Sequence, residues 1–504
     1  MHNAASRPTA PMTAGSVPVQ LTSACGQVRA AGKADAVGGV VPSYVATPTS
    51  TQEASAVLRA AAGLGLAVVP RGCGTRLDWG APPSRCDLVV DTRLMDTVLE
   101  HAAGDLVARV QAGVRLDRLA DVLGQASQRL ALDPPGSESP ANGGDLAEGG
   151  TGVCGTGVCG TVGGLIATGV AGPLRLRFGS PRDLLIGITM VRADGTVARA
   201  GGKVVKNVAG YDIGKLLAGS YGTLGLITEA TFRLHPRPPA AAYVSLACPD
   251  AAVAAAALLT AAGSALAPAA AELDWPGQDA PISLAVLLEG DAEGVAERAT
   301  RMRDLLNGEA FPRLLAGPRA SADLPQWWGR GAAAGAGTAV RIAFWAGQLT
   351  AVLMAIRAVG AQTGLDPAVG GSAAAGVLHA ALPADAPTTA VAQFVTGLRT
   401  ALSEDLPGSG AQASTGAQAS TGAQASTGAQ ASTAAQASTG VDADAAVRSA
   451  TGPRGSVVVL HAPPAVRDAV DIWGPVPAVA LMRAIKEQFD PEHRMAPGRF
   501  AGGI

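Results

Sequence analysis

Two glycine-rich turns contain the residues of this chain that are best suited to binding chemistry. The first turn consists of Pro70, Arg71, Gly72, Cys73, Gly74 and Thr75, and the second of Thr161, Val162, Gly163 and Gly164. Because glycine has no Cβ, successive backbone N–H groups in such a turn can point into one concavity, which suits an anionic phosphate. A single glycine-rich turn is commonly only a turn. Two of them, each after a strand-like segment, predict a site that holds a pyrophosphate from both sides.

The lysines add a further group to this prediction. The chain contains five lysines, and Lys203, Lys206 and Lys215 lie close together in the sequence. A compact ammonium group is a better point charge beside a phosphate than a guanidinium group. Two interpretations stay open: Lys206 lies near a bound cofactor, or the three lysines mark the solvated end of a helix.

Short apolar segments are expected to deliver both turns. Ser50 and Glu53 have the spacing of a capping box, which predicts a helix that begins after Ser50 and ends near Gly63. The apolar segment 66–70 is expected to be a strand that leads into the first turn. Further elements are expected as strands at 87–91 and 106–110, a helical stripe at 116–123 and a β-hairpin at 186–197. No Gly-x-Gly-x-x-Gly motif leads from an N-terminal strand into a helix, which disfavours a Rossmann site.

Composition limits the classes of protein to which the chain can belong. Its 504 residues suffice for two or three domains, and 48% hydrophobic residues allow an ordinary buried core. A net charge of −2 gives no reason to expect nucleic acid as a partner. Six cysteines are too few for a disulfide-stapled scaffold or for an iron–sulfur cluster in this chain, so a reduced cytoplasm is the expected location.

No segment is expected to span a membrane or to direct export. Arg7 is not followed by the apolar run of a signal peptide. Residues 251–271 carry no charge, but they are rich in alanine and are interrupted by Gly263 and Pro268. A packed helix is therefore favoured over a membrane span.

One internal repeat is evident. The unit Ala-Gln-Ala-Ser-Thr-Gly recurs in tandem over residues 411–440, and its side chains cannot bury enough surface to offset chain entropy. The segment is expected to be a flexible insert that can be deleted without loss of stability. It is either a spacer or the product of slippage in a repetitive gene, and the doubled Gly-Thr-Gly-Val-Cys unit at 150–159 fits the second origin.

Taken in order, the motifs resemble a known flavoprotein superfamily. The two turns are followed by Lys206-Asn207-Val208-Ala209-Gly210-Tyr211-Asp212 and by Gly219-Ser220-Tyr221-Gly222-Thr223-Leu224-Gly225-Leu226-Ile227-Thr228-Glu229. The order and residues of these motifs resemble those of the vanillyl-alcohol oxidase/PCMH superfamily and, within it, those of the FAD-binding E subunits of bacterial glycolate oxidases. The resemblance covers residues 40–240 in detail and the last fifteen residues more loosely.

The resemblance implies an α+β fold in which a two-subdomain PCMH-type FAD-binding domain is followed by an α+β FAD-linked oxidase-like C-terminal cap. The implied organisation is a flexible tail at 1–36, the FAD-binding domain at 37–240, the cap at 241–402, a low-complexity linker at 403–452 and a closing segment at 453–504 that packs on the flavin domain. Trp327-Trp328 and Phe344-Trp345 are expected to supply aromatic core to the cap.

The resemblance also implies how the cofactor is held. The expected FAD contacts comprise both turns together with Asp183, Lys206, Gly225 and Ile227. Thr75 stands where the histidyl-linked branch of the superfamily has its linking histidine, so FAD is expected to be noncovalent. The closing segment has Ala496 where the family usually has asparagine before Pro-Gly-Arg.

The implied function is that of the FAD-binding subunit of a glycolate oxidase, which oxidises glycolate to glyoxylate with a larger homologous flavin subunit and an iron–sulfur subunit. Such a complex would be cytoplasmic, at the inner face of the membrane. The six histidines are scattered without metal-ligand spacing, so the catalytic residues stay unknown, no metal is expected, and His379 is expected in a core or surface role. The substrate-binding groups are therefore expected on the larger subunit. Two alternatives stay open: a self-sufficient FAD-dependent dehydrogenase for another 2-hydroxy acid such as D-lactate, and a non-catalytic subunit that only holds flavin.

Overall fold

Helices and strands are intermixed along the described residues, in agreement with the predicted α+β class. The computed structural model describes residues 16–135, 160–202, 212–308, 311, 313–329, 337–403 and 455–504. The predictions on Lys206 and on the repeat at 411–440 lie outside these residues. The α-helices are α1 (Ser16–Ala24), α2 (Thr51–Gly63), α3 (Leu116–Gly124), α4 (Val162–Thr168), α5 (Arg175–Phe178), α6 (Pro181–Leu184), α7 (Ile213–Leu217), α8 (Ala251–Ala262), α9 (Ala292–Leu306), α10 (Leu349–Thr363), α11 (Thr388–Ser403), α13 (Pro464–Ala469) and α14 (Val479–Phe489).

A small mixed sheet delivers the first glycine-rich turn. Its strands, in order, are β1 (Val28–Ala30), β2 (Tyr44–Ala46), β4 (Leu88–Asp91) and β3 (Val68–Arg71). The last three are parallel, and α2 connects β2 to β3. The predicted cap of α2 is confirmed, because the Ser50 hydroxyl accepts a hydrogen bond from the Glu53 amide at 3.2 Å. The Glu53 carboxylate differs from a full capping box, since it accepts from Thr49 instead of Ser50.

A five-stranded antiparallel sheet supports the second turn. Its order is β5 (Val98–Ala102), β6 (Val107–Gln111), β10 (Leu226–Arg233), β8 (Leu185–Val191) and β9 (Val197–Gly201). The β8–β9 pair confirms the predicted hairpin. Ile166 of α4 packs against Phe232 and Ala230 of β10 in one buried cluster, which fixes α4 on this sheet. A short pair, β7 (Gln128–Arg129) and β11 (His235–Pro236), lies beside it.

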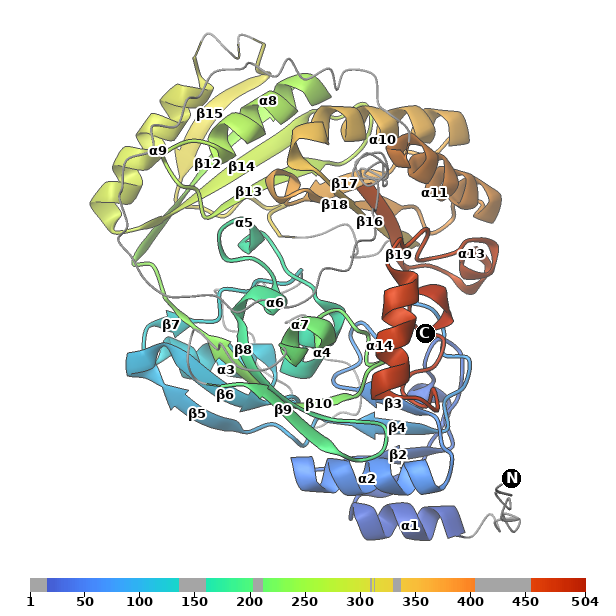
Figure 1. Cartoon of the computed structure of the whole chain (residues 1–504). Coiled ribbons are helices and arrows are strands. Elements are labelled where there is room, and N and C mark those ends of the chain that lie inside the picture. The colour runs from blue at the N-terminus through green and yellow to red at the C-terminus, as the bar shows by residue number, and fades with distance from the viewer. Residues whose placement is uncertain are drawn as a thin grey trace, which may run out of the picture.

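An eight-stranded antiparallel sheet forms the rest of the molecule. Its order is β15 (Ala316–Ser321), β12 (Ala240–Cys248), β14 (Ile282–Gly290), β13 (Ala270–Trp275), β17 (Ala368–Gly371), β18 (Val377–Leu382), β16 (Thr338–Phe344) and β19 (Gly455–His461). Helices α8, α9, α10 and α11 cover one face of this sheet, and the other face is turned toward the smaller sheets (Figure 1).

The strands of the large sheet alternate between these two faces. Along β13, Leu273 and Trp275 enter the core beneath the helices, whereas Ala270 packs with Leu174 on the face toward the smaller sheets. Glu272 shares that second face with Ala270. The alternation therefore places polar side chains where the two halves of the molecule meet.

The C-terminal segment runs from the large sheet back to the first sheet (Figure 1). Its backbone pairs with β3: the Val68 amide donates to the Arg494 carbonyl, and the Ala496 amide donates to the Val68 carbonyl, both at 2.8 Å. Helix α14 lies in this segment, just before the residues that pair with β3. The closing segment thus lies beside the strand that leads into the first turn.

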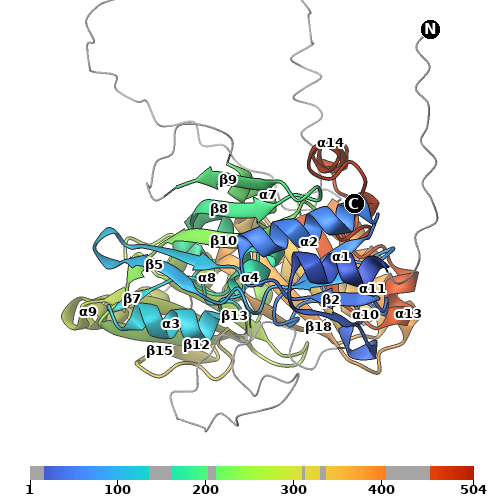
Figure 2. The same cartoon turned by 90° about the horizontal axis from the view of Figure 1, so that it is seen from below.

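Three sequence-based expectations are settled by these elements. The tail predicted at 1–36 is wrong for residues 16–36, because α1 lies beside α2 (Figure 2) and buries Leu21 completely. Trp328 is buried as expected, but Trp345 is wrong as a core residue, since it is 74% exposed. Among the described residues, no helix has the length and apolar character needed to cross a membrane.

Candidate functional site

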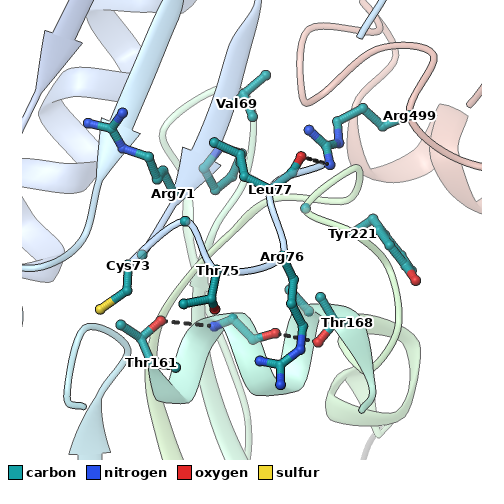
Figure 3. Close-up of a pocket in the computed structure, with 17 residues that line it drawn as sticks. Val69, Arg71, Cys73, Thr75, Arg76, Leu77, Thr161, Thr168, Tyr221 and Arg499 are labelled. Carbon is teal, nitrogen blue, oxygen red and sulfur yellow. Dashed lines mark hydrogen bonds between the residues drawn. The ribbon is translucent and has the colours of Figure 1, made fainter. Parts of the chain in front are cut away.

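A cavity opens where the two glycine-rich turns and the C-terminal segment meet (Figure 3). It encloses about 600 Å³ of space, part of it open to solvent. It is lined by Val69, Pro70, Arg71, Gly72, Cys73, Gly74, Thr75, Arg76, Leu77, Gly160, Thr161, Gly164, Ala167, Thr168, Tyr221, Gly222 and Arg499. The whole predicted first turn is therefore in this lining, together with Thr161 and Gly164 of the second.

The first turn presents free backbone donors to the cavity. The turn is closed by the Leu77 amide, which donates to the Gly74 carbonyl at 3.1 Å, and Gly74 adopts a left-handed φ of 77°. Within the described part of the chain, the amides of residues 73–76 donate no hydrogen bond. A row of unused N–H groups in a turn of this kind is an anion-binding nest.

The second turn is the wall against which the first turn packs. A Cβ on Gly72 would collide with Oγ1 of Thr161. Thr161 is held in place because its hydroxyl caps α4 by accepting from the Gly164 amide at 3.2 Å. Glycine at position 72 is therefore what allows the two turns to touch.

The expectation that the second turn also offers a row of free amides is corrected by its hydrogen bonds. The Val162 amide donates to Val114 at 2.9 Å, and the Gly163 amide donates to Ala112 at 2.7 Å. These bonds anchor the start of α4 to the segment that follows β6. The second turn therefore contributes the Thr161 side chain and the surface of Gly164, and the phosphate-type donors lie on the first turn.

Arg71 has a structural role beside the cavity. Its guanidinium forms ion pairs with Asp35 at 3.0 Å and with Asp91 at 2.9 Å, and Figure 3 shows it pointing away from Thr161 and Arg76. The Arg29 hydrogen bond is the main cause that lowers the pKa of Asp35. Burial of Asp91 opposes ionisation, but hydrogen bonds from Arg93 and the charge of Arg71 lower its pKa. The network keeps β3, and hence the first turn, in place.

Two further arginines face the cavity without a carboxylate partner among the described residues. Arg499 is 4% exposed and donates from Nη2 to the Leu77 and Trp79 carbonyls, while its Nε and Nη1 have no partner. Burial lowers the pKa of Arg499 to about 10 and also lowers that of Arg76. Both remain cations at neutral pH. The cavity is thus suited to a negatively charged ligand.

Tyr221 separates this cavity from the large sheet. It adopts a left-handed φ of 54°, and its ring meets Trp473 edge-on at a centroid distance of 5.1 Å. Such a conformation is strained for a non-glycine residue and is found where surrounding packing enforces it. Here Trp473 and Phe500 supply that packing.

Several predicted contacts lie outside the cavity lining. Val162 is fully buried in the core, and Gly163 is packed against Ala112. Asp183 caps α6 by accepting from the Ser180 amide and hydroxyl, both at 2.8 Å. Gly225 directly precedes β10 and Ile227 is its second residue, and neither is in the lining. Contacts of these residues with FAD, and that of Lys206, stay predictions.

A second, polar cavity lies between the flavin-side segments and the large sheet. It encloses about 260 Å³ and is lined in part by Pro135, Gly172, Arg175, Glu272, Ser372 and His379. From the sheet, the neighbouring strands β16 and β18 place Arg341 directly opposite His379. Glycines 370 and 371 of β17 leave the floor of this region without side chains.

The charged groups around this second cavity are not neutralised in pairs. Neither Arg175 nor Arg341 forms an ion pair with a described residue, although the Arg175 Nη2 donates to the Ala171 carbonyl at 2.7 Å. Burial raises the pKa of Glu272 to about 8 and that of Asp133 to about 7. Burial, reinforced by the two arginines, lowers the pKa of His379 to about 3. At neutral pH Glu272 is therefore mostly protonated, Asp133 is about half protonated and His379 is neutral.

The two cavities are adjacent. Ala167 and Thr168 line the first, Ala171 and Gly172 line the second, and one short stretch of chain carries all four. Arg76 of the first cavity donates to the carbonyl of Pro135, which lines the second, at 3.1 Å. A ligand bound along the first turn would therefore reach the edge of the polar cavity.

The sequence did not predict the residues of the polar cavity, and it predicted only some of the residues that line the flavin cavity. The expectation of a core or surface role for His379 did not anticipate its position in a polar cavity. Arg499 could have been singled out from its Pro-Gly-Arg context, because the closing segment was expected to pack on the flavin domain. Among the described residues, no three His, Cys, Asp or Glu side chains are arranged to hold a metal ion.

Comparison with known proteins agrees with this geometry. The FAD binding domain family matches residues 42–156 and 145–201, a region that carries both turns. The match supports the FAD-linked oxidase/PCMH superfamily for this part of the chain, and FAD is its cofactor. The residues present fit that cofactor, since the free amides of 73–76 and the unpartnered Nη1 of Arg499 face one cavity.

Relatives with assigned activities match the same region. The chain is 36% identical over 199 residues to "Glycolate oxidase subunit GlcD" of Bacillus subtilis, which is 39% of this chain and 38% of that protein. It is 38% identical over 193 residues to "D-lactate dehydrogenase" of Archaeoglobus fulgidus, covering 38% of this chain and 39% of that protein. It is 33% identical over 173 residues to "Glycolate oxidase subunit GlcE" of Escherichia coli, covering 34% and 43%. The matched segment thus spans about two fifths of the length of these relatives.

The fold beyond the matched region has a counterpart among solved structures. An alkyldihydroxyacetonephosphate synthase superposes with a TM-score of 0.61 and 16% identity, over 97% of this chain and 86% of that one. At this identity the likeness concerns the fold. The likeness covers almost the whole chain and so includes the eight-stranded sheet.

Proposed function

We propose that this chain is an FAD-dependent oxidoreductase that oxidises a small 2-hydroxy acid where its FAD-binding domain meets the eight-stranded sheet. The observation that supports this most is the polar cavity beside the flavin cavity. Arg175 lines that cavity, and neither Arg175 nor Arg341 has a carboxylate partner there among the described residues.

The chain's own residues would hold the substrate and exclude water. A guanidinium group binds a carboxylate through two parallel hydrogen bonds, so Arg175 and Arg341 are the groups for the acid end. The cavity lies between the flavin-side segments and the large sheet, and substrate bound there would displace water from around the reacting carbon. Bound FAD supplies the acceptor for the hydride that leaves C2 of the substrate.

The cofactor is proposed to be noncovalent. Thr75, in place of a linking histidine, lines the flavin cavity. Arg499 and Arg76 would face the negative charge of the bound group, and the free amides of the first turn would face its phosphates.

At a finer level, we propose glycolate as the substrate and a role as the FAD-binding subunit of a glycolate oxidase. The relatives named for glycolate oxidase subunits support this reading. The partners would be a larger homologous flavin subunit and an iron–sulfur subunit, in the cytoplasm at the inner face of the membrane. Because the polar cavity lies on this chain, we assign the oxidation to this chain and the onward passage of electrons to the partners.

A self-sufficient dehydrogenase is the second candidate. A relative named for D-lactate dehydrogenase supports this candidate. For this candidate, we propose D-lactate instead of glycolate as the preferred substrate.

Steady-state dye reduction separates these candidates. Glycolate-dependent reduction is measured for the single chain and for the complex purified from the native host, at equal flavin concentration. The subunit role predicts a much higher rate per flavin in the complex. Equal rates per flavin would instead support the self-sufficient dehydrogenase. If glycolate never reduces the flavin in the complex, only a flavin-holding role would be left.

A further inference from the structure

Glu272 is a buried carboxyl group whose side chain reaches the polar cavity. It lies on β13, on the face that is turned toward the flavin-side segments, and the residue is 4% exposed. Its Oε1 is hydrogen-bonded to the Ser372 hydroxyl at 2.5 Å. No described residue forms an ion pair with it.

The hydrogen bonds of Ser372 allow Glu272 to exist in two protonation states. A hydroxyl carries one proton, and the Ser372 oxygen lies 2.5 Å from Glu272 and 3.4 Å from the Gly172 carbonyl. When Glu272 is protonated, its O–H can donate to Ser372 while Ser372 donates to Gly172. When Glu272 is ionised, Ser372 turns to donate to Glu272. Oε1 of Glu272 thus keeps its hydrogen bond to Ser372 in both states, which suits a group that gains and loses a proton.

The other titratable groups around Glu272 are less suited to take a proton from a ligand. His379 is held neutral with a pKa of about 3, so it is a weak base. Asp133 is outside the cavity lining, and both its oxygens accept from the Leu174 amide. The remaining charged groups that face this region are Arg175, Arg341, Arg129 and Asp274.

We propose that Glu272 is the catalytic residue that accepts the hydroxyl proton of the 2-hydroxy acid. This inference rests on the proposed function. The substrate O–H bond breaks and its proton passes to the Glu272 carboxylate, while the C2–H bond breaks and its electron pair leaves with the hydrogen as hydride to FAD. A carbon–oxygen double bond forms, the product is a 2-oxo acid, and the proton returns to solvent. Ser372 is a positioning residue that stabilises the ionised form.

The main test compares wild-type protein with Glu272→Gln in anaerobic mixing with glycolate, and follows the loss of flavin absorbance. Because a general base contributes about 10²–10⁴-fold, reduction should slow by at least about 100-fold in E272Q at unchanged flavin content. The rate for wild type should rise with pH around the Glu272 pKa of about 8, since only the ionised form accepts a proton. Glu297→Gln, an exposed residue of α9, is the matched control and should behave as wild type.

A second readout needs no turnover. The folded-state pKa of Glu272 lies above its unfolded value, so the folded protein keeps a proton that the unfolded chain loses between about pH 4.3 and pH 8. Stability conferred by this group is therefore full at low pH and lost as the pH rises through about 8. The melting temperature of E272Q relative to wild type should increase over that range.

A third variant keeps the inference testable if E272Q fails to hold flavin. Ser372→Ala removes the hydrogen bond that favours the ionised carboxyl, so the rising limb of the pH–rate profile should move to higher pH. Equal reduction rates for wild type and E272Q, or an unshifted limb in S372A, would overturn the role of Glu272 and leave the proposed function intact. A wild-type flavin that no 2-hydroxy acid reduces would remove the proposed function and this inference together.

Discussion

At the scale of single residues, the contact between Gly72 and Thr161 controls the shape of the flavin cavity. The two residues belong to turns that are far apart in the sequence, and the Thr161 hydroxyl and methyl groups occupy the space that a Cβ on residue 72 would need. Any larger residue at 72 must push α4 away from the first turn. The free amides of 73–76 would then lose their position relative to the rest of the cavity.

Gly72→Val should therefore abolish or strongly reduce FAD binding. Each phosphate bond that is lost leaves a donor unpaired, at a cost of about 1–3 kcal/mol. The flavin-to-protein ratio after gel filtration is the measurement. Gly104→Val is the matched control, because a Cβ at Gly104 meets nothing within 4 Å. Full flavin occupancy in G72V would show that FAD is not bound at these turns.

The sequence predicted site residues that belong to one short segment, but not those that reach the cavity from distant segments. Glycine spacing predicts the first turn, because a backbone that must expose its amides needs residues without Cβ. The same reasoning over-assigned the second turn, whose amides are used by Val114 and Ala112. Arg499 and Tyr221 reach the cavity through packing of distant segments, and spacing along the chain does not predict that.

At the scale of elements, α14 and the residues after it hold the flavin cavity closed. Lys486 is fully buried, and its Nζ donates to Asp490 at 2.7 Å, to the Thr223 carbonyl at 2.7 Å and to the Met495 carbonyl at 2.9 Å. One ammonium group thus joins the helix, the closing segment and the flavin-side domain. Burial lowers the pKa of Lys486, but the Asp490 charge opposes that change.

Lys486→Met should destabilise the protein by about 3–5 kcal/mol, because it leaves the Asp490 carboxylate buried without its cation. Urea unfolding followed by tryptophan fluorescence is the measurement. Lys215→Met, at a surface lysine 3.9 Å from Asp212, should cost less than about 1 kcal/mol. The double variant K486M/D490L should recover much of the loss. If K486M and K215M had the same urea midpoint, the Lys486 ammonium would not be holding the closing segment on the flavin-side domain.

Helices and strands could be predicted where a short sequence pattern, such as a helix cap or a turn, determines the local structure. The Ser50 cap and the β8–β9 hairpin follow from capping and turn patterns. Residues 16–36 were misjudged because α1 owes its order to contact with α2 through Leu21, not to its own sequence. The alanine-rich strands of the large sheet carry little periodic signal, so their order could not be deduced.

At the scale of the whole molecule, the polar cavity exists only because the two halves meet. Arg175 comes from the flavin side, whereas Glu272, Arg341, Ser372 and His379 come from different strands and connections of the large sheet. No motif links these positions in the sequence. The family resemblance predicts the superfamily and the fold. The residues of the polar cavity, to which the sequence assigned no catalytic role, come together only in the folded chain.

The most direct test of the central claim is reduction of the bound flavin by substrate in the absence of oxygen and of any partner. The purified chain is mixed anaerobically with glycolate, with acetate, which lacks the hydroxyl group, or with ethylene glycol, which lacks the carboxylate. We predict that glycolate or D-lactate bleaches the flavin within a single turnover and that acetate and ethylene glycol leave it oxidised. If dithionite reduces the flavin but no 2-hydroxy acid does so, this chain does not oxidise such acids at its own cavity.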